Sequence, residues 1–404
     1  MNDRLEILAP AGDRERLEAA LLFGADAVYL AGKAYGMRSA PANFDEEGLR
    51  QAVSLAHKTG RKVYVTVNVL PRNGEMEALP AYLEFLQGCG ADGIIAADLG
   101  VMRLALRHAP RCALHVSTQT GVVNFETARM LHDLGAARVV LARELSLDEI
   151  AEIRAKTPPE LELEAFVHGA MCVSYSGRCL LSNYMTGRDA NRGACAQPCR
   201  YQYALVEEKR PGEYFPIGED AGGAFILNSR DMCMIDHVPE LMDAGLDSLK
   251  IEGRAKSAYY AAIVTAAYRH AIDAARAGEP LDPVWRAEVD KVSHRPYSTG
   301  FYYGEPGQHT AHARYLRDWQ VVGVVTSCAP DGSALCELRN KFAGGDELEL
   351  VGPGVRPVSF RVEGLTDGDG LPIPEARKPQ MPFRLRLPVQ APPLSLLRRK
   401  AVGL

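Results

Sequence analysis

Residues 139–167 read VVLARELSLDEIAEIRAKTPPELELEAFV and contain one complete strand–helix–strand unit. Val139 to Leu141 is a short apolar run typical of a buried strand, and Leu161 to Val167 is a second such run. Between them, Ser146-Leu147-Asp148-Glu149 matches a capping box, the sequence signature of a helix N-terminus. The unit therefore predicts two parallel strands joined by a helix.

The same unit repeats over the first 170 residues, with short apolar runs alternating with helical patterns. Each unit is about 20–35 residues long, which favours a TIM-barrel-like (β/α)8 domain of the α/β class. Counting the runs produces nine strand candidates for eight barrel positions, and the pattern does not identify the extra one. The candidates are 5–9, 27–30, 63–67, 93–96, 114–117, 139–141, 161–167, 225–228 and 248–251.

The residue pattern along the chain changes twice, and these changes predict its domain organisation. A cysteine-rich stretch interrupts the repeats after Val167, a long helix is expected over 256–277, and short β runs separated by Gly and Pro follow Trp319. The expected parts are a TIM-barrel-like catalytic domain with a Cys-rich insertion, a connector, a small C-terminal β-barrel and a short basic tail. Their boundaries are 1–285 (insertion 168–224), 286–318, 319–392 and 393–404.

Composition narrows the class of protein. The chain has 404 residues, of which 47% are hydrophobic and 24% charged, and these values favour a globular protein with a buried core. A net charge of -5 argues against nonspecific nucleic-acid binding by the whole surface, although not against a local basic groove. The N-terminus shows no leader pattern, and no apolar run approaches a membrane span. We expect a cytoplasmic protein without membrane association, and composition leaves its oligomeric state open.

The cysteines are unevenly distributed. Five of the nine fall between positions 172 and 233, and thiolates are ligands for both zinc and iron–sulfur clusters. Their spacing matches neither the common zinc ribbon nor the usual ferredoxin runs, so zinc and inert buried thiols remain alternatives. The five are Cys172, Cys179, Cys195, Cys199 and Cys233.

Arginines surround these cysteines, including Arg178, Arg188, Arg192 and Arg200. The planar guanidinium donates paired hydrogen bonds to phosphate and carboxylate groups, so the segment is a candidate anion-binding rim. A charged surface loop, balanced by acidic neighbours, explains the composition equally well.

The chain also resembles a known family. The strings EAFVHGAMC at 164–172 and SGRCLLS at 176–182 are similar to the signature of the collagenase-like peptidase family U32. The similarity spans nearly the whole chain and is closest to members that are prephenate-dependent tRNA uridine hydroxylases. Further matching segments are 8–12, 141–146, 183–184, 187–193, 195–200 and 248–254.

The resemblance implies a function and a cofactor. It implies oxygen-independent formation of 5-hydroxyuridine at the wobble position of tRNA, with prephenate as hydroxyl donor and a 4Fe-4S cluster. Carried over by motif, the cluster ligands are Cys172, Cys179, Cys195 and Cys233, with Cys199 in reserve. Family relatives acting on rRNA make that a second candidate substrate.

A hydroxylase that uses a dicarboxylate needs cations at the carboxyl ends of the barrel strands, where active sites of such barrels lie. Residues following strand candidates supply the expected catalytic groups, Arg143, His168, Lys250 and Arg254. The expected substrate-binding residues are Arg38, Asn68, Arg188 and Arg192.

A peptidase remains the competing interpretation. The sequence contains neither a His-Glu-x-x-His motif nor a Gly-x-Ser-x-Gly motif. His168 lies close to Cys172 in sequence, so a Cys–His pair is the machinery that this alternative would use.

Overall fold

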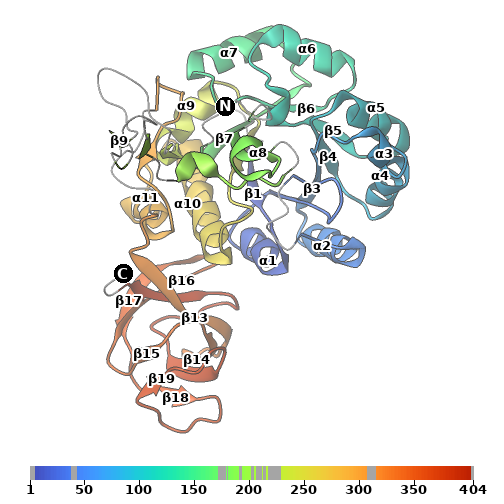
Figure 1. Ribbon diagram of the computed structural model, residues 1–404. Helices are drawn as coiled ribbons and strands as arrows, with labels where there is room; N and C mark the ends of the chain where they lie inside the picture. Colours follow the sequence, from blue (N-terminus) through green and yellow to red (C-terminus); the bar gives the residue numbers. More distant parts are fainter. Residues whose placement is uncertain are drawn as a thin grey trace.

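The structure, a computed structural model, describes residues 5–37, 43–171, 179, 181–190, 193–201, 204–205, 212, 215–216, 229–306 and 315–401. Its first part is a barrel of eight parallel strands (Figure 1). The barrel closes because β11 pairs with both β1 and β7. The barrel strands are β1 (Glu6–Pro10), β2 (Ala27–Leu30), β3 (Lys62–Val67), β4 (Gly93–Ala96), β5 (Ala113–Val116), β6 (Arg138–Val140), β7 (Glu162–Ala170) and β11 (Ser248–Ile251).

Helices surround the barrel (Figure 1). Several begin at an Asp, Asn or Ser whose side chain accepts a hydrogen bond from the first turn, and the capping box at Ser146 and Glu149 is confirmed. Within the described residues, no helix has the length and apolar character needed to cross a bilayer. The helices are α1 (Arg14–Leu22), α2 (Glu46–Lys58), α3 (Asn73–Met76), α4 (Leu79–Gly88), α5 (Leu99–His108), η1 (Thr118–Thr120), α6 (Phe125–Asp133), α7 (Leu147–Lys156), η4 (Ile235–His237), α9 (Val238–Asp243) and α10 (Ala258–Ala277).

The predicted TIM-barrel-like fold is therefore confirmed, as is the long helix, which is α10. Eight of the nine strand candidates coincide with barrel strands. The ninth candidate, 225–228, lies outside the described residues.

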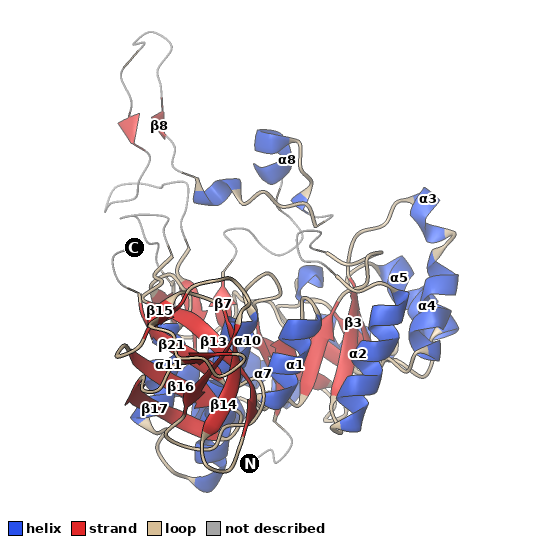
Figure 2. Ribbon diagram, turned by 90° about the horizontal axis from the view of Figure 1, so that it is seen from below, coloured by secondary structure: helices blue, strands red, loops and turns tan. Residues whose placement is uncertain are grey.

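A segment that follows β7 extends beyond the carboxyl end of the barrel. It contains α8 (Leu181–Thr186), η3 (Pro198–Arg200) and a two-stranded pair of β8 (Ala204–Leu205) with β9 (Phe215–Pro216). Figure 1 shows α8 in front of the barrel, and Figure 2 shows it standing beyond one end of the strands. This end is the carboxyl end, because α8 follows the carboxyl end of β7 in the chain.

The sheet continues past the barrel at β7. The last residues of β7 pair antiparallel with β10 (Asp231–Cys233), and β12 (Tyr297–Ser298) lies parallel to β10. The chain between α10 and the C-terminal part also forms α11 (Pro283–Glu288) and η5 (Val289–Lys291). The described part of the expected connector therefore continues the barrel sheet through β12.

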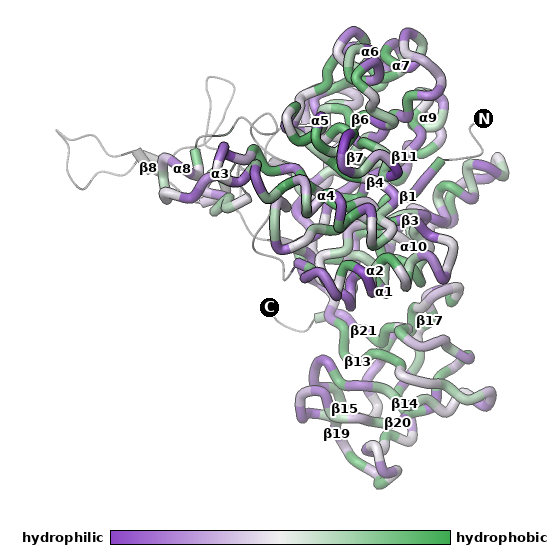
Figure 3. Tube along the Cα trace, turned by 90° about the vertical axis from the view of Figure 1, so that its right-hand side faces the viewer, coloured by the Kyte–Doolittle hydropathy of each residue, from purple (hydrophilic) through white to green (hydrophobic). Residues whose placement is uncertain are grey.

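The C-terminal part is an antiparallel β domain with its own apolar core, as predicted. Its main sheet has seven strands in the order β17-β16-β21-β13-β14-β20-β18. Figure 3 shows the barrel and this domain as two bodies that meet near β21 and β17. The strands are β13 (Trp319–Cys328), β14 (Ser333–Leu338), β15 (Phe342–Ala343), β16 (Glu347–Gly352), β17 (Val355–Arg361), β18 (Thr366–Asp367), β19 (Glu375–Ala376), β20 (Pro382–Arg386) and β21 (Leu396–Lys400).

The expectation that 393–404 is a tail was wrong. Within this range, β21 pairs with β13 on one side and β16 on the other, so it is a central strand of the sheet. Leu397 is fully buried in the domain core, and Arg398 is fully buried as well. A basic segment can occupy this position because Glu288 and Glu349 neutralise Arg398, and both carboxylates come from distant parts of the chain.

Candidate functional site

The interior of the barrel is charged rather than wholly apolar. Arg138 on β6 donates hydrogen bonds to Glu6 on β1 at 2.7 Å and to Glu164 on β7 at 2.9 Å. Lys250 on β11 donates to Glu164 at 2.6 Å. Glu164 is 0% exposed and Lys250 only 4%, so each charge depends on its partners for solvation. We call these four residues the barrel cluster.

The pKa values of this cluster agree with ionised pairing. Burial alone would raise the pKa of the Glu6 carboxyl, but the charge and hydrogen bonds of Arg138 outweigh burial and hold this pKa below its ordinary value. Burial would likewise lower the pKa of Arg138, yet Glu6 and Glu164 hold it well above its ordinary value. His115 lies edge-on to the Tyr64 ring, and burial together with the nearby Arg138 and Lys250 charges keeps its pKa low.

Two of the predicted cations meet at the carboxyl end of the strands. The Arg143 guanidinium lies 3.8 Å from the Phe166 ring centroid, and Lys250 Nζ lies 5.4 Å from the same centroid. Arg143 also donates to the Ala170 carbonyl at 2.9 Å and lies 3.7 Å from a carboxylate oxygen of Glu252. Its Nε atom is buried without a hydrogen-bond acceptor among the described residues. The structure thus brings Arg143 and Lys250 around one aromatic ring.

Arg254 and Asn68 form a second group, joined through Met37. Arg254 donates to Thr66 Oγ1 at 2.9 Å and to the Met37 carbonyl, and Asn68 Oδ1 accepts from the Met37 N–H at 3.0 Å. Asn68 also donates to Gln119, which follows β5, at 2.9 Å. Residues that follow four different barrel strands, β2, β3, β5 and β11, are therefore linked by hydrogen bonds at the mouth.

Gly12 explains the close packing of this group. A Cβ added at Gly12 would lie 2.2 Å from the carbonyl oxygen of Arg254. Only glycine permits the turn after β1 to approach the turn after β11 so closely. This contact holds the Arg254 backbone over the barrel mouth.

His168 lies apart from the three cations. Its ring is surrounded by Tyr260, Tyr268 and Tyr297, with centroids 5.9, 5.5 and 5.3 Å away, and Nε2 lies 3.4 Å from the Tyr297 hydroxyl. A register shift between β7 and β11 occurs at this point, and His168 packs on α10, not over the Phe166 ring. Burial lowers the pKa of His168 to about 3, so the ring is neutral. Its catalytic role stays a prediction.

The described cysteines are not assembled into a ligand group. Cys233 is buried on β10 opposite His168, and burial raises the pKa of its thiol to about 11. Cys195 is exposed, Cys179 is partly exposed, and Cys199 belongs to η3, which packs against α8. Among the described residues, no three His, Cys, Asp or Glu side chains lie close enough to hold a metal. The predicted ligand Cys172 lies outside the described residues. Thiolates are suitable ligands for an iron–sulfur cluster, but the described cysteines are not arranged as a ligand set.

Of the remaining predicted substrate-binding residues, Arg188 is the one within the described chain. Arg188 is exposed just after α8, where its backbone N–H donates to Thr186 Oγ1 at 3.4 Å. Arg38 and Arg192 lie outside the described residues.

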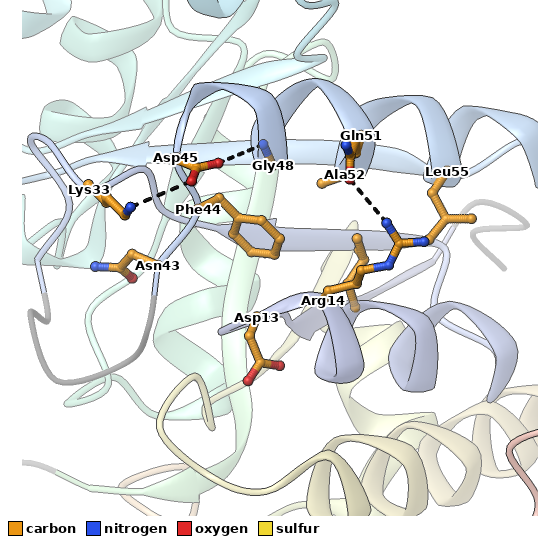
Figure 4. Close-up of a pocket in the computed structure, with 11 residues that line it drawn as sticks. Asp13, Arg14, Lys33, Asn43, Phe44, Asp45, Gly48, Gln51, Ala52 and Leu55 are labelled. Carbon is orange, nitrogen blue, oxygen red and sulfur yellow. Dashed lines mark hydrogen bonds and ion pairs between the residues drawn. The ribbon is translucent and has the colours of Figure 1, made fainter.

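A cavity of about 220 Å³ lies beside the mouth, between α1 and α2 (Figure 4). Its charged groups are engaged with one another or with the helices. Asp13 and Asp45 cap α1 and α2, Lys33 lies 3.5 Å from Asp45, and Arg14 donates to Gln51 at 3.1 Å. The cavity lies between helices outside the barrel wall, and we do not assign the site to it.

Several residues at the mouth were missed from sequence. The Phe166 ring contacts Arg143 and Lys250, Glu252 lies 3.7 Å from Arg143, and Gln119 accepts a hydrogen bond from Asn68. Glu144 follows Arg143, and burial raises the pKa of its carboxyl. Their position at the carboxyl end of a strand was the available signal, but the groups expected there were cations, His168 and Asn68.

An eight-stranded parallel barrel with arginine and lysine gathered at the carboxyl ends of its strands defines a TIM-barrel protein with cationic side chains at its mouth. The chain belongs to peptidase family U32: residues 12–312 match the model of that family, and residues 317–398 match the model of its C-terminal domain. The family predicted from the sequence motifs is therefore confirmed.

Curated relatives cover almost the whole chain. "tRNA hydroxylation protein P1" of Bacillus subtilis (strain 168) is 38% identical over 98% of this chain and 94% of its own. "tRNA hydroxylation protein P" of Escherichia coli (strain K12) is 36% identical over 92% of this chain and 91% of its own. A 23S rRNA 5-hydroxycytidine synthase of the same E. coli strain is 39% identical over 67% of this chain but only 40% of its own.

Proposed function

We propose that this chain is a tRNA hydroxylase that forms 5-hydroxyuridine at the wobble position and takes the hydroxyl group from prephenate. The observation that carries the proposal is similarity along the full length, C-terminal β domain included, to proteins named for tRNA hydroxylation. The rRNA-modifying relative is matched over less than half of its own length, which favours tRNA over rRNA. Since tRNA is cytoplasmic, we also infer a cytoplasmic location.

The barrel mouth supports a dicarboxylate donor. Prephenate carries two carboxylates, and the mouth holds two separate arginines, Arg143 beside the Phe166 ring and Arg254 beside Thr66. Arginine binds carboxylate through paired N–H groups, and burial strengthens the attraction because water screens it less. In this proposal Arg143 binds one carboxylate through the guanidinium edge that includes its unpaired Nε, and Arg254 orients the other.

We include a 4Fe-4S cluster in the proposal, held by Cys172, Cys179, Cys195 and Cys233 with Cys199 in reserve. The support is the thiolate chemistry of the donors and their concentration in one segment that begins at the carboxyl end of β7. A cluster of this kind supplies a redox-active centre when bound. The residues of the barrel mouth act independently of it, by binding and orienting the donor and excluding water.

The test is complementation of an E. coli strain that lacks its tRNA hydroxylation protein P. Expression of this chain should restore 5-hydroxyuridine-derived nucleosides in total tRNA, measured by mass spectrometry. Arg143→Ala should reduce the restored signal by about tenfold or more, because a lost charge-assisted hydrogen bond costs about 1.5–3 kcal/mol. Arg129→Ala is the matched control, since Arg129 is exposed on α6, away from the mouth.

Two further results would separate the alternatives. Feeding prephenate labelled with oxygen-18 at its hydroxyl to the purified chain should transfer the label to the tRNA nucleoside. Unchanged tRNA from cells that contain soluble chain would contradict the proposal. Modified rRNA in the same cells would then indicate the rRNA reaction, and peptide cleavage abolished by Cys172→Ala would indicate a peptidase.

A further inference from the structure

Helix α8 exposes an aromatic side chain at the carboxyl end of the barrel. Tyr184 is 85% exposed, the largest exposed fraction of any large apolar side chain among the described residues. Met185 beside it is 45% exposed, and Tyr201, just after η3, is 50% exposed. Exposed aromatic groups of this size are costly in water, and clusters of them commonly mark interaction surfaces.

The segment that carries Tyr184 is held together by its own hydrogen bonds. The buried Ser182 side chain accepts from the Ala196 N–H at 3.0 Å, which ties α8 to the chain before η3. Thr186 Oγ1 donates to the Ser182 carbonyl at 2.7 Å, and the Tyr201 hydroxyl donates to the Ala196 carbonyl at 2.9 Å. Tyr184 is therefore presented by a small packed unit, with its ring turned outward.

Location and charge indicate what this unit binds. Figures 1 and 2 agree that α8 stands beyond the carboxyl ends of the strands, the same end at which Arg143 and Arg254 lie. Residues 181–201 contain three arginines and one acidic residue, Asp189, so the segment is cationic by sequence. A cationic segment with exposed aromatic rings matches the surface of proteins that bind unpaired nucleotides, where bases stack on rings and arginines meet phosphates.

We propose that Tyr184 stacks on an unpaired base of the RNA substrate next to the base that enters the barrel mouth. This inference rests on the proposed function, because it takes RNA as the substrate class. Stacking on a flat ring recognises an unpaired loop without reading its sequence, since every base has an aromatic face. A base must leave its neighbours to reach a pocket, and a ring at the entrance compensates for part of the stacking that is lost.

The test measures RNA binding by the purified full-length chain. The probe is a fluorescein-labelled RNA hairpin with an unpaired loop, and a blunt duplex with the same stem is the comparison. Tyr184→Ala should weaken hairpin binding by about 5- to 150-fold, the range for one stacked base, and should leave duplex binding unchanged. Tyr184→Phe keeps the ring and should bind within about twofold of the parent. Met130→Ala, which truncates an exposed apolar side chain on α6, is the matched control and should also have no effect.

Salt dependence separates stacking from charge. Arg188→Ala should make the plot of log affinity against log salt less steep, by about 0.7 for one single-strand phosphate contact. Tyr184→Ala should lower affinity at every salt concentration without changing the slope. Equal hairpin affinity of Tyr184→Ala and the parent would overturn the inference. So would a smaller particle mass for Tyr184→Ala in light scattering, because the ring would then belong to an interface between copies of the chain.

The two proposals fail separately. If Tyr184→Ala loses hairpin binding while the parent produces no hydroxylated tRNA, the RNA surface stands and the reaction is another. If the parent hydroxylates tRNA and Tyr184→Ala binds RNA normally, the reaction stands and this surface is wrong.

Discussion

Two buried ion clusters occupy different parts of the molecule, and each centres on an arginine that pairs with two largely buried glutamates. In the barrel cluster, Arg138 lies between Glu6 and Glu164. In the second cluster, Arg398 on β21 donates to Glu288 of α11 at 2.6 Å and to Glu349 of β16 at 2.8 Å. Lys291 lies 2.9 Å from both of these glutamates. We call Arg398, Glu288, Glu349 and Lys291 the interface cluster.

The clusters differ in what they join. All members of the barrel cluster come from strands of one closed barrel, so this cluster cannot open unless the barrel does. The interface cluster joins strands of the C-terminal β domain to helices packed on the barrel, and Arg398 also donates to the Tyr259 hydroxyl of α10 at 3.0 Å. The barrel cluster therefore stabilises a single domain, whereas the interface cluster fixes the orientation of the C-terminal β domain relative to the barrel.

The largest effect is expected from Arg138→Met. This substitution leaves Glu6 buried without a counter-charge and Glu164 with Lys250 as its remaining one. Breaking a buried pair in this way costs about 3–5 kcal/mol. Urea denaturation followed by circular dichroism should show this loss in the main transition. The matched control Arg129→Met removes an exposed ion pair with Glu126 and should cost less than about 1 kcal/mol. Equal stability of the two variants would show that the barrel cluster is not a structural requirement.

Arg398→Met should have the next largest effect, about 3 kcal/mol, because it leaves the carboxylates of Glu288 and Glu349 with Lys291 as their remaining counter-charge. The separation of the two clusters predicts which strands and helices lose stability. Amide hydrogen exchange should accelerate in β16, β21 and α11, while β1, β6 and β7 stay protected. The control is Arg399→Met on the same strand, because Arg399 pairs with Asp346 inside the β domain. Faster exchange across the barrel strands would contradict the separation of the two clusters.

Acid should weaken the barrel before the interface. Burial lowers the pKa of His168 to about 3, below its ordinary value of 6.5, so the unfolded chain takes up this proton first. The stability contributed by neutral His168 is complete above pH 6.5 and is lost as the pH falls toward 3. About 2 kcal/mol of the barrel's unfolding free energy should be lost between pH 7 and pH 5.

His168→Gln should remove this part of the pH dependence. His115 is also buried with a lowered pKa, so the unfolding free energy of both the parent and the variant keeps some dependence on pH. The quantity to measure is therefore the difference between the two plots of unfolding free energy against pH. Parallel profiles from pH 7 to pH 5 would contradict the buried neutral state of His168.

The smallest effect is expected from Lys291→Met, about 1 kcal/mol, because Glu288 and Glu349 keep Arg398 as a partner. Urea denaturation of this variant sharpens the comparison by showing how far Arg398 alone holds the interface. Lys341→Met is the control, since its pair with Glu375 is exposed and should contribute little. A loss larger than that of Arg398→Met would identify Lys291 as the centre of the interface cluster.

Much of the fold could be predicted because it depends on local pattern. The strand–helix periodicity identified the barrel strands, and the Ser146 capping box identified the start of α7. The central strand β21 was missed because Arg398, Arg399 and Lys400 are typical of a solvated end. The aromatic surroundings of His168 could not be predicted, because Tyr260, Tyr268 and Tyr297 come from distant parts of the chain.

The candidate site was only partly predictable. Arg143, Lys250 and Arg254 could be named because each follows or ends a barrel strand, and the structure gathers them at one end. Phe166, which both Arg143 and Lys250 approach, looked like an ordinary core residue. The predicted cluster ligands remain a prediction, since Cys172 lies outside the described residues.

By itself, then, the sequence determined the order of strands and helices, the family and the types of residue at the strand ends. These follow from periodicity and short motifs, which act over a few residues. Only the tertiary structure decided which charges are paired, which aromatic rings are exposed and which face of a strand a side chain takes. A buried charge such as Arg398 is stable only beside partners from distant parts of the chain, Glu349 at 49 and Glu288 at 110 residues away. No local pattern contains that information.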